Sequence, residues 1–459
     1  MSDQQLEQTK QELRDAFDRM IENFQAARDA IDTAELFPVP ASDRNLAEGY
    51  RYVMGFMLNG IERALSDPLY PRFRRAIQPM NRSTIDNADA VYLAAEIDGN
   101  YSYKITGKAL DSRHWRGEDP CQGPRAPQYV IFELASGYAG DSGSLKEMMP
   151  GTRINTAVLD CHNLSVEADG SFEILIAPEK PAGYLGNFML SRRESRGKEY
   201  VGSFLTCREL FHDWENEDLL DLEILRLGCE LEPRPPLDSA AAMQMMDRTG
   251  TIAKNQVHFW NAFNTITLET YGKTQWGAGG DNDGKAFMPT NDMNPPNALG
   301  IATGGGQSTN IYAGGVYQLD DSQALLIQSE VPVPPSFMGF HLANLWGESL
   351  DFESYQSNLN AHMMQRDEDG MYRWVVCHRD PGIANWVDTT GLPHGYLTIR
   401  WTYPHQPPKE DWPSLTVALI PFEEIRSHLP AETATASAAD RGAGRLMRHR
   451  HVQRRYRQY

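Results

Sequence analysis

The chain has 459 residues, of which 41% are hydrophobic and 23% are charged, proportions that are ordinary for a soluble globular protein. Single hydrophobic cores stop growing at about 250–300 residues, so we expect two or three substructures. The five cysteines are widely spaced and form no Cys-x-x-Cys pair, which argues against a disulfide framework or a structural zinc site and for reduced thiols.

Charge and hydropathy exclude two classes of partner. The formal net charge is −19, and without the seven arginines that follow Asp440 it falls to −26. A body that acidic repels nucleic acid and anionic membranes, so nucleic acid is expected at most at the arginine-rich end. The N-terminus has no apolar stretch, and no run approaches the about 18 apolar residues that span a bilayer. We therefore expect a cytoplasmic protein without a signal peptide or membrane segment.

The first 80 residues have helical periodicity. Apolar side chains recur three or four residues apart, at Leu13, Phe17, Ile21 and Phe24. This spacing predicts an amphipathic helix over 4–31. A second helix is predicted next, for which Ser42 or Asp43 could be the cap. A short third helix is predicted over 69–77. Residues 1–80 are thus expected to form an N-terminal helical region.

The pattern then alternates with a period of two residues, which is typical of strands. Short apolar runs separated by turns predict a first β sandwich over 81–204. Helical spacing returns over 205–231 and about 238–270, so residues 205–271 are predicted to be interdomain helices. Residues 272–311 form a loop rich in Gly and Asn, and a loop of this length is expected to be functional, as a lid beside a site.

A second series of strands predicts a second β sandwich over 312–429. Residues 430–459 have little apolar content and are expected to be a disordered basic tail. Its arginines could contact nucleic acid, an acidic partner or the acidic body of a neighbouring subunit, or have no specific role. We favour the neighbouring subunit, because body and tail carry opposite charges. The predicted fold class is α+β, mainly β, with two antiparallel sandwiches, an N-terminal helical layer and interdomain helices.

Scattered blocks of the chain resemble the bacterial family catalogued as domain of unknown function 1214. The blocks are 86–92, 101–107, 317–319, 331–335, 340–346 and 380–386, with Arg400 and 403–404. The resemblance implies that both sandwiches are jelly-roll-like and that the protein assembles as a homo-oligomer. No activity is assigned to the family, so the resemblance implies no catalytic residue. Residues 387–389, Val-Asp-Thr, depart from the Leu-Pro that is commoner at this point of the family.

An Asn-Trp pair heads the candidates for ligand binding. Trp386 beside the amide of Asn385 could stack on a ring-shaped ligand and hydrogen-bond its edge. The structural alternative is that Trp386 fills the core while Asn385 satisfies the backbone of a turn. Trp346 and Trp260 are further ligand-binding candidates, again with core packing as the alternative.

Three residues are candidates for catalysis. A pocket histidine whose pKa is near its ordinary value can act as a general base, and this role is considered for His341 and His258. Arg400 could hold the carboxylate of a substrate. The structural alternatives are that His341 hydrogen-bonds a neighbouring strand and that His258 packs among the aromatic residues of its helix.

A metal site is the least favoured interpretation. His378 and Asp380 have the His-x-Asp spacing of a facial iron triad, for which His394 or His405 could supply a third ligand. Asp380 also opens an Asp-Pro-Gly turn, where aspartate usually caps the backbone. We favour the capping role, and the sequence identifies no cofactor.

Together these patterns predict a protein that binds or transforms a small, partly apolar organic molecule. The expected site is a cleft between the second sandwich and the interdomain helices, lined by Trp386, Asn385, His341, Arg400 and His258. The alternatives are a carbohydrate-active enzyme that uses carboxylates such as Glu133, Asp160 and Glu173, a non-haem iron oxygenase, and a structural assembly module. The sequence leaves open whether the protein is an enzyme.

Overall fold

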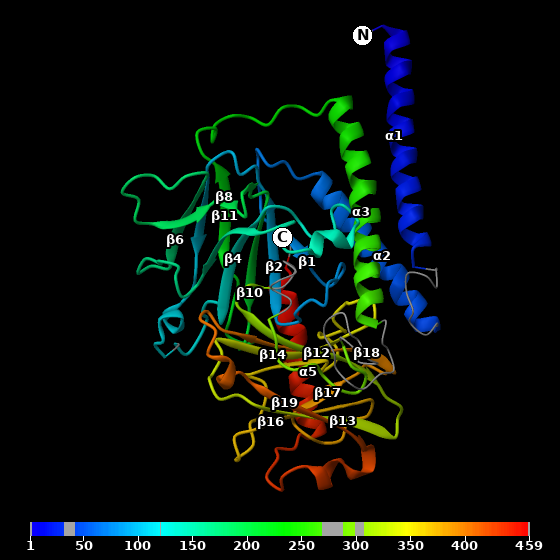
Figure 1. The fold of residues 1–459 in the computed structure, drawn as a ribbon, viewed down its shortest axis with the longest axis vertical. Helices are drawn as coiled ribbons and strands as arrows, with labels where there is room; N and C mark the ends of the chain where they lie inside the picture. The colour runs from blue at the N-terminus through cyan, green and yellow to red at the C-terminus, as the bar shows by residue number, and fades with distance from the viewer. Residues whose placement is uncertain (1, 32–41, 120, 269–287, 299–306, 458–459) are drawn as a thin grey trace.

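The computed structural model describes residues 2–31, 42–119, 121–268, 288–298 and 307–457. The protein is α+β and mainly β, as predicted: two pairs of packed sheets lie one above the other in Figure 1, beside long helices. Within the described ranges, no helix is both long and apolar enough to cross a membrane.

The first sandwich pairs a five-stranded sheet, ordered β1-β2-β10-β4-β5, with a four-stranded sheet, ordered β11-β3-β6-β7. The strands are β1 (Arg74–Ile77), β2 (Ala90–Glu96), β3 (Tyr103–Lys108), β4 (Tyr129–Ala135), β5 (Asn155–Asp160), β6 (Ser171–Ala177), β7 (Asn187–Leu190), β10 (Phe204–Leu210) and β11 (Asp221–Arg226). A separate hairpin joins β8 (Arg192–Ser195) to β9 (Lys198–Val201). Between the two sheets lies a core that includes Ile105, Phe132 and Ile174.

The second sandwich pairs two four-stranded sheets, ordered β12-β18-β14-β15 and β17-β16-β13-β19. The strands are β12 (Asn310–Gln318), β13 (Gln323–Glu330), β14 (Phe337–Ala343), β15 (Asn358–Asn360), β16 (Tyr372–Cys377), β17 (Trp386–Asp388), β18 (His394–Thr402) and β19 (Ser414–Pro421). Its core includes Phe340, Trp374 and Trp401. Alternation along each strand separates this core from an outer face, and the outer face of β12 and β18 is the one that meets the first sandwich.

Three long helices lie along one side of the sandwiches (Figure 1). α1 (Asp3–Asp29) and α2 (Asp43–Ala64) begin after Ser2 and Ser42, whose hydroxyls accept backbone N–H groups of the first turn. α3 (Ser239–Leu268) packs against both of them. Short 3-10 helices are η1 (Arg113–Arg116), η2 (Leu145–Met148), η3 (Lys409–Asp411) and η4 (Phe422–His428).

Two segments predicted as helices are strands, which corrects the interdomain region 205–271. Residues 205–231 contain most of β10 and all of β11. Among the described residues of 205–271, α3 is therefore the one helix. β10 hydrogen-bonds β2 on one edge and β4 on the other, and these pairings outweigh the local helical spacing. The helix predicted over 69–77 is also wrong, because its last four residues form strand β1. The lid predicted over 272–311 falls mostly outside the described residues.

The C-terminal segment is a helix that spans both sandwiches (Figure 1), so the prediction of a disordered tail over 430–459 is wrong. α5 (Ala438–Arg455) begins with a capping box formed by Ser437 and Asp440. Three of its arginines, Arg441, Arg448 and Arg455, are buried against this same chain. The expected role of these arginines in binding a neighbouring subunit is therefore corrected: their partners are intramolecular.

Arg448 connects the second sandwich to a buried carboxylate of the first. Its Nη1 donates to Oδ1 of Asn358 (2.6 Å), and the Asn358 amide donates to Oδ1 of Asp89 (3.0 Å). Asn360 and Trp214 donate to the same oxygen of Asp89 (2.9 and 3.1 Å). Burial raises the pKa of Asp89 to about 6 and lowers that of Arg448 to about 10. Each charge lowers the cost of burying the other.

Two further residues of α5 contact the first sandwich near Asp89. Nη2 of Arg455 donates to the carbonyl of Ala88 (2.8 Å), and its guanidinium carbon lies 4.9 Å from the Trp214 ring centroid. The imidazole of His451 stacks on Trp214, with centroids 4.7 Å apart and an interplanar angle of 21°. α5 thus fixes the first sandwich against the second through aromatic packing as well as charge.

Replacing Arg448 should destabilise the protein because it removes one of the two cations, Arg448 and Arg455, that offset the buried Asp89 carboxylate. It also leaves Oδ1 of Asn358 without its charged donor. We expect Arg448→Met to lower the free energy of unfolding by about 3–5 kcal/mol, measured by urea denaturation. Arg450, which is exposed on the same helix, is the matched control: Arg450→Met should change stability by less than about 0.5 kcal/mol. Equal stability of the two variants would contradict this role for α5.

Candidate functional site

A cavity of about 590 Å³ lies between the two sandwiches and α3. One wall is the outer face of the five-stranded sheet of the first sandwich, and a second wall is the outer face of β12 and β18. α3 supplies the third wall. Enclosed hollows of this size that are mostly apolar, with a few polar groups, are the usual form of small-molecule sites.

The first-sandwich wall owes its composition to strand alternation. Every second residue of β10 faces the cavity, namely Phe204, Thr206, Arg208 and Leu210. In register beside them lie Tyr92 of β2, opposite Arg208, and Glu133 of β4, opposite Thr206. Nη1 of Arg208 forms an ion pair with Glu133, and its guanidinium carbon is 5.9 Å from the Tyr92 ring centroid.

The second-sandwich wall carries Arg400 and Thr398 of β18, which lie opposite Tyr312 and Gly314 of β12. Nη1 of Arg400 lies 2.7–2.8 Å from the ring nitrogens of His341, and its Nη2 donates to the carbonyl of Ile85. Burial and the adjacent guanidinium hold the pKa of His341 well below its usual range. The imidazole is therefore neutral and accepts a hydrogen bond from Arg400.

The wall formed by α3 is aromatic. Phe259, Trp260 and Phe263 line the cavity from successive turns of the helix. The Trp260 ring meets the other two edge-on, at centroid distances of 4.9 and 5.6 Å, and its Nε1 donates to Oε1 of Gln256 (3.0 Å). Since the polar atom of Trp260 is already bonded within the helix, its ring offers the cavity an apolar surface.

Of the five residues predicted to line a cleft, Arg400 alone lies on the cavity wall, joined by the further candidate Trp260. His341 supports Arg400 from behind and is not among the lining residues. His258 is also absent from the lining, although its neighbours on α3 belong to it. Its side chain is half-buried, and burial lowers its pKa. The cleft was predicted between the second sandwich and the interdomain helices. The observed cavity has an additional wall, formed by the first sandwich.

Asn385 and Trp386 adopt their structural alternatives, which corrects their assignment as ligand-binding residues. The Asn385 amide donates to the carbonyls of Gln365 (2.6 Å) and Arg373 (3.0 Å). Trp386 is 8% exposed, donates through Nε1 to the carbonyl of Cys377 (3.0 Å), and lies under the guanidinium of Arg441 on α5. Asn385 thus joins segments within the second sandwich, and Trp386 packs this sandwich against α5.

Trp346 likewise belongs to the core. Its Nε1 donates to the carbonyl of Asn45 (2.8 Å), and its ring lies 5.5 Å from that of Tyr52. A Cβ at Gly49 would lie 2.6 Å from the Trp346 ring, so the glycine allows α2 to approach the sandwich this closely. Trp346 therefore docks α2 and does not reach the cavity.

The proposed iron ligands are occupied with other partners. Asp380 caps its own turn by accepting the N–H of Gly382 (2.9 Å), and it pairs with Arg441 (3.0 Å). His378 contacts the Thr389 hydroxyl and the carbonyl of Leu319. Throughout the described part of the chain, no three His, Cys, Asp or Glu side chains, His394 included, gather in a geometry that could hold a metal.

The sequence did not single out Arg208, Tyr92, Thr398 or Tyr312 as site residues, and it considered Glu133 only as one of several strand carboxylates. The cavity-facing residues of β10 were not predicted, because the apolar spacing of residues 205–231 is compatible with a helix and the strand was therefore not recognised. The usable signal was the alternation of Phe204, Thr206, Arg208 and Leu210, which places an arginine in a row of otherwise uncharged residues.

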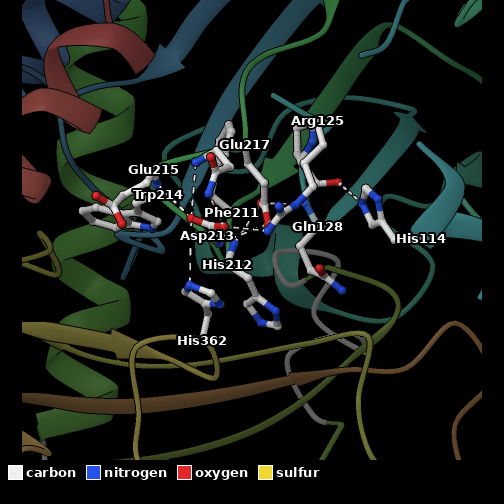
Figure 2. Close-up of polar contacts among 12 residues, drawn as sticks. His114, Arg125, Gln128, Phe211, His212, Asp213, Trp214, Glu215, Glu217 and His362 are labelled. Atoms are coloured by element: carbon white, nitrogen blue, oxygen red, sulfur yellow. Dashed lines mark hydrogen bonds and ion pairs between the residues drawn. The ribbon is translucent and has the colours of Figure 1, made fainter. Parts of the chain in front are cut away.

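A second cluster of ionisable residues joins the sandwiches below β10 (Figure 2). Asp213 accepts from Nη2 of Arg125 (2.6 Å) and lies 3.8 Å from the exposed imidazole of His362. Glu217 accepts the backbone N–H groups of His212, Asp213 and Gln128 (2.9–3.0 Å). These carboxylates are used to hold the loop after β10.

His212 extends this cluster to the second sandwich (Figure 2). Its Nε2 accepts the N–H of Met338 (3.2 Å), and its ring stacks on Phe337 at 4.9 Å. Burial lowers the pKa of His212 to about 3, so the ring is a neutral acceptor. The Asp-His composition resembles that of a catalytic site, but the contacts are those of a structural joint between the sandwiches.

A smaller hollow of about 430 Å³ at the edge of the first sandwich contains a buried acid. Oε2 of Glu209 accepts the N–H of Leu220 (3.0 Å), whereas Oε1 finds no hydrogen-bond partner in the described parts of the chain. Burial raises the pKa of Glu209 to about 8. The side chain is therefore protonated at neutral pH.

No family model and no curated protein matches the chain. Among solved structures, an uncharacterised protein from Burkholderia cenocepacia is similar over 91% of this chain and 100% of that chain, with 22% sequence identity and a TM-score of 0.71. The VPA0106 protein from Vibrio parahaemolyticus aligns over 86% of this chain and 100% of that chain, with 12% identity and a TM-score of 0.39. The first likeness shows that the fold occurs elsewhere. The resemblance to domain of unknown function 1214 stays a prediction.

The buried Glu209 should make stability depend on pH. Its pKa is higher in the folded than in the unfolded state, so its favourable contribution is complete below about pH 4.5 and is lost as the pH rises towards 8. We expect Glu209→Gln, which mimics the neutral acid, to match the parent protein near pH 5 and to exceed its stability at pH 9 by about 2–4 kcal/mol. Chemical denaturation at both pH values measures this difference. Glu223→Gln, at an exposed position of β11, is the control, and identical pH profiles for the two variants would contradict the assignment.

Proposed function

We propose that the protein binds a small, partly apolar organic molecule in the cavity between the two sandwiches and α3. The observation that carries the proposal is a cavity of about 590 Å³ lined by an aromatic helix and two sheet faces. Outer faces of sheets are usually covered by packed side chains or by solvent, and a space left between two of them suits a ligand.

The wall chemistry favours this function over carbohydrate hydrolysis. Glycoside hydrolysis generally uses two carboxyl groups about 5–9.5 Å apart. Among the described lining residues Glu133 is the one carboxylate, and it is paired with Arg208. Asp160 and Glu173 lie outside the lining, where they bond Tyr129 and Lys104.

Filling the cavity tests the proposal. Thr206 lies on β10 at the centre of the first-sandwich wall, and Thr206→Phe should occupy the space that a ligand needs. We expect small, partly apolar molecules from a screening library to raise the melting temperature of the parent protein but not that of Thr206→Phe. Thr106→Phe, at an exposed position on β3 of the same sandwich, is the matched control. A library without any stabilising member, or equal shifts in Thr206→Phe, would refute the proposal.

We also propose that the protein is cytoplasmic, has jelly-roll-like sandwiches and assembles as a homo-oligomer. The reduced cysteines support the first point and the resemblance described above supports the other two. Assembly is further supported by exposed apolar side chains at helical spacing along α2 and at its C-cap, namely Leu46, Tyr50, Met54, Ile61 and Leu65. Exposed apolar rows of this kind favour contacts between proteins.

A charge within this row should weaken assembly. Met54 is 67% exposed, so Met54→Glu leaves the fold intact while placing a carboxylate in the contact. We expect the parent protein to elute as an oligomer and Met54→Glu as a smaller species, measured by size-exclusion chromatography with light scattering. Leu185→Glu, at a 95% exposed site of the first sandwich, should leave the size unchanged. A monomeric parent protein would overturn the proposal of assembly.

A further inference from the structure

We propose that the ligand of the cavity is an organic carboxylate, whose charged end binds beside Arg400, Arg208 and Thr398. This inference rests on the proposed function, because it names the chemical class of molecule that the same cavity takes. Four independent features of the wall lead to it: the charge balance, the partners of Arg400, the unused hydroxyl of Thr398, and the two phenols beside the arginines.

The charge balance of the wall is positive, although the chain as a whole carries −19. The charged side chains among the described lining residues are Glu133, Arg153, Arg208 and Arg400. Glu133 neutralises Arg208 through their ion pair, and Arg153 interacts with the carboxylates of Glu147 and Asp141. The formal positive charge of Arg400 then remains facing the cavity. Buried cations require a counter-charge, and an anionic ligand would provide it.

Arg400 has no carboxylate partner at ion-pair distance, and Asp86 interacts with it only at longer range. It is 7% exposed, and no Asp or Glu oxygen of the described residues lies within 4.0 Å of its guanidinium. Its partners are the neutral imidazole of His341 and the carbonyl of Ile85. By contrast, the buried Arg63 and Arg373 pair with carboxylates at 2.8 and 2.6 Å.

Thr398 presents an unused hydroxyl to the same space. It is 6% exposed, lines the cavity, and its Oγ1 forms no hydrogen bond with any described residue. Thr402, on the same face of β18, instead donates to Oδ1 of Asn310 (2.6 Å). A buried hydroxyl without a partner is costly, and a carboxylate oxygen near Arg400 would accept a hydrogen bond from it.

Two phenols flank the arginines. The Tyr92 ring lies 5.9 Å from the guanidinium carbon of Arg208, and the Tyr312 ring lies 5.8 Å from that of Arg400. The Tyr92 hydroxyl accepts the N–H of Asn87 (2.8 Å), and burial raises its pKa to about 12. The phenol therefore stays neutral, and its O–H can donate a hydrogen bond to an anion.

The remainder of the cavity fixes the kind of anion. Planar guanidinium groups match planar carboxylates through paired N–H···O bonds. Away from the arginines the wall is apolar, with Phe259, Trp260 and Phe263 on α3. One charged end and one apolar end thus describe the ligand: a monocarboxylate with an aliphatic or aromatic body.

Matched probe pairs test the inference. 3-Phenylpropanoate and decanoate would each be compared with the primary alcohol of the same skeleton, by isothermal titration calorimetry at pH 7.5. We expect each acid to bind at least ten-fold more tightly than its alcohol, because the alcohol cannot neutralise the guanidinium groups. Inorganic phosphate and a phenylalkyl phosphate would be measured alongside, and tighter binding of the phosphate ester than of the acids would overturn the carboxylate assignment.

Two variants locate the charged end. Arg400→Gln should weaken acid binding at least ten-fold and leave alcohol binding unchanged, a selective loss that general destabilisation would not produce. Thr398→Val should weaken acid binding about three-fold or more; since its hydroxyl has no partner, this variant should fold even if Arg400→Gln does not. Arg450→Gln, exposed on α5, is the control and should bind both probes as the parent protein does.

The outcomes separate this inference from the proposed function. Equal affinity for acids and alcohols would overturn the inference and leave the proposed function in place. Acid binding that resists both Arg400→Gln and Thr398→Val would overturn the location of the charged end. If neither the acids nor the alcohols bind and the screening library also gives no stabilising molecule, both proposals fail.

Discussion

The packing of one face of α5 against both sandwiches is the constraint on which the rest of the structure depends. Arg448 of this helix bonds Asn358 of the second sandwich, and Asn358 in turn bonds the buried Asp89 of the first. If the sandwiches moved apart, Arg448 of α5 and Asp89 of the first sandwich could not both stay buried on this hydrogen-bonded chain, because each would lose a charge that offsets its desolvation. This coupling fixes the distance between the two outer sheet faces, and the cavity is the space left between them.

The position of the cavity explains its unusual charge. Arg208 and Arg400 lie on the outer faces of two different sheets, where either residue alone would be an ordinary solvated side chain. Once the sandwiches are fixed against each other, both face the same enclosed volume. Burial lowers the pKa of Arg208, and the charge of Arg400, screened less here than at the surface, lowers it further. An acidic protein thereby obtains a positively charged interior site without a basic surface.

Two sequence signals failed for a physical reason that they share. Residues 205–210 have apolar spacing compatible with a helix, but β10 is the central strand of a sheet and gains partners on both edges. The C-terminal arginines have the composition of a disordered tail, but their long side chains reach backbone carbonyls and the carboxylate of Asp380 within the fold. In both cases the stabilising partners are more than 50 residues away in the sequence, where local composition carries no information about them.

By itself the sequence determined the mainly β class, two sandwiches, the helices 3–29, 43–64 and 239–268 in outline, and the alternation that puts Thr398 and Arg400 on one face of β18. These features follow from hydrophobic periodicity, which is a local property. Only the tertiary structure decided that Trp386 and Asn385 are core residues, that α5 is ordered, and that Arg208 meets Arg400 across a cavity. Those outcomes depend on which faces of distant elements pack together, and the periodicity of each element leaves that choice open.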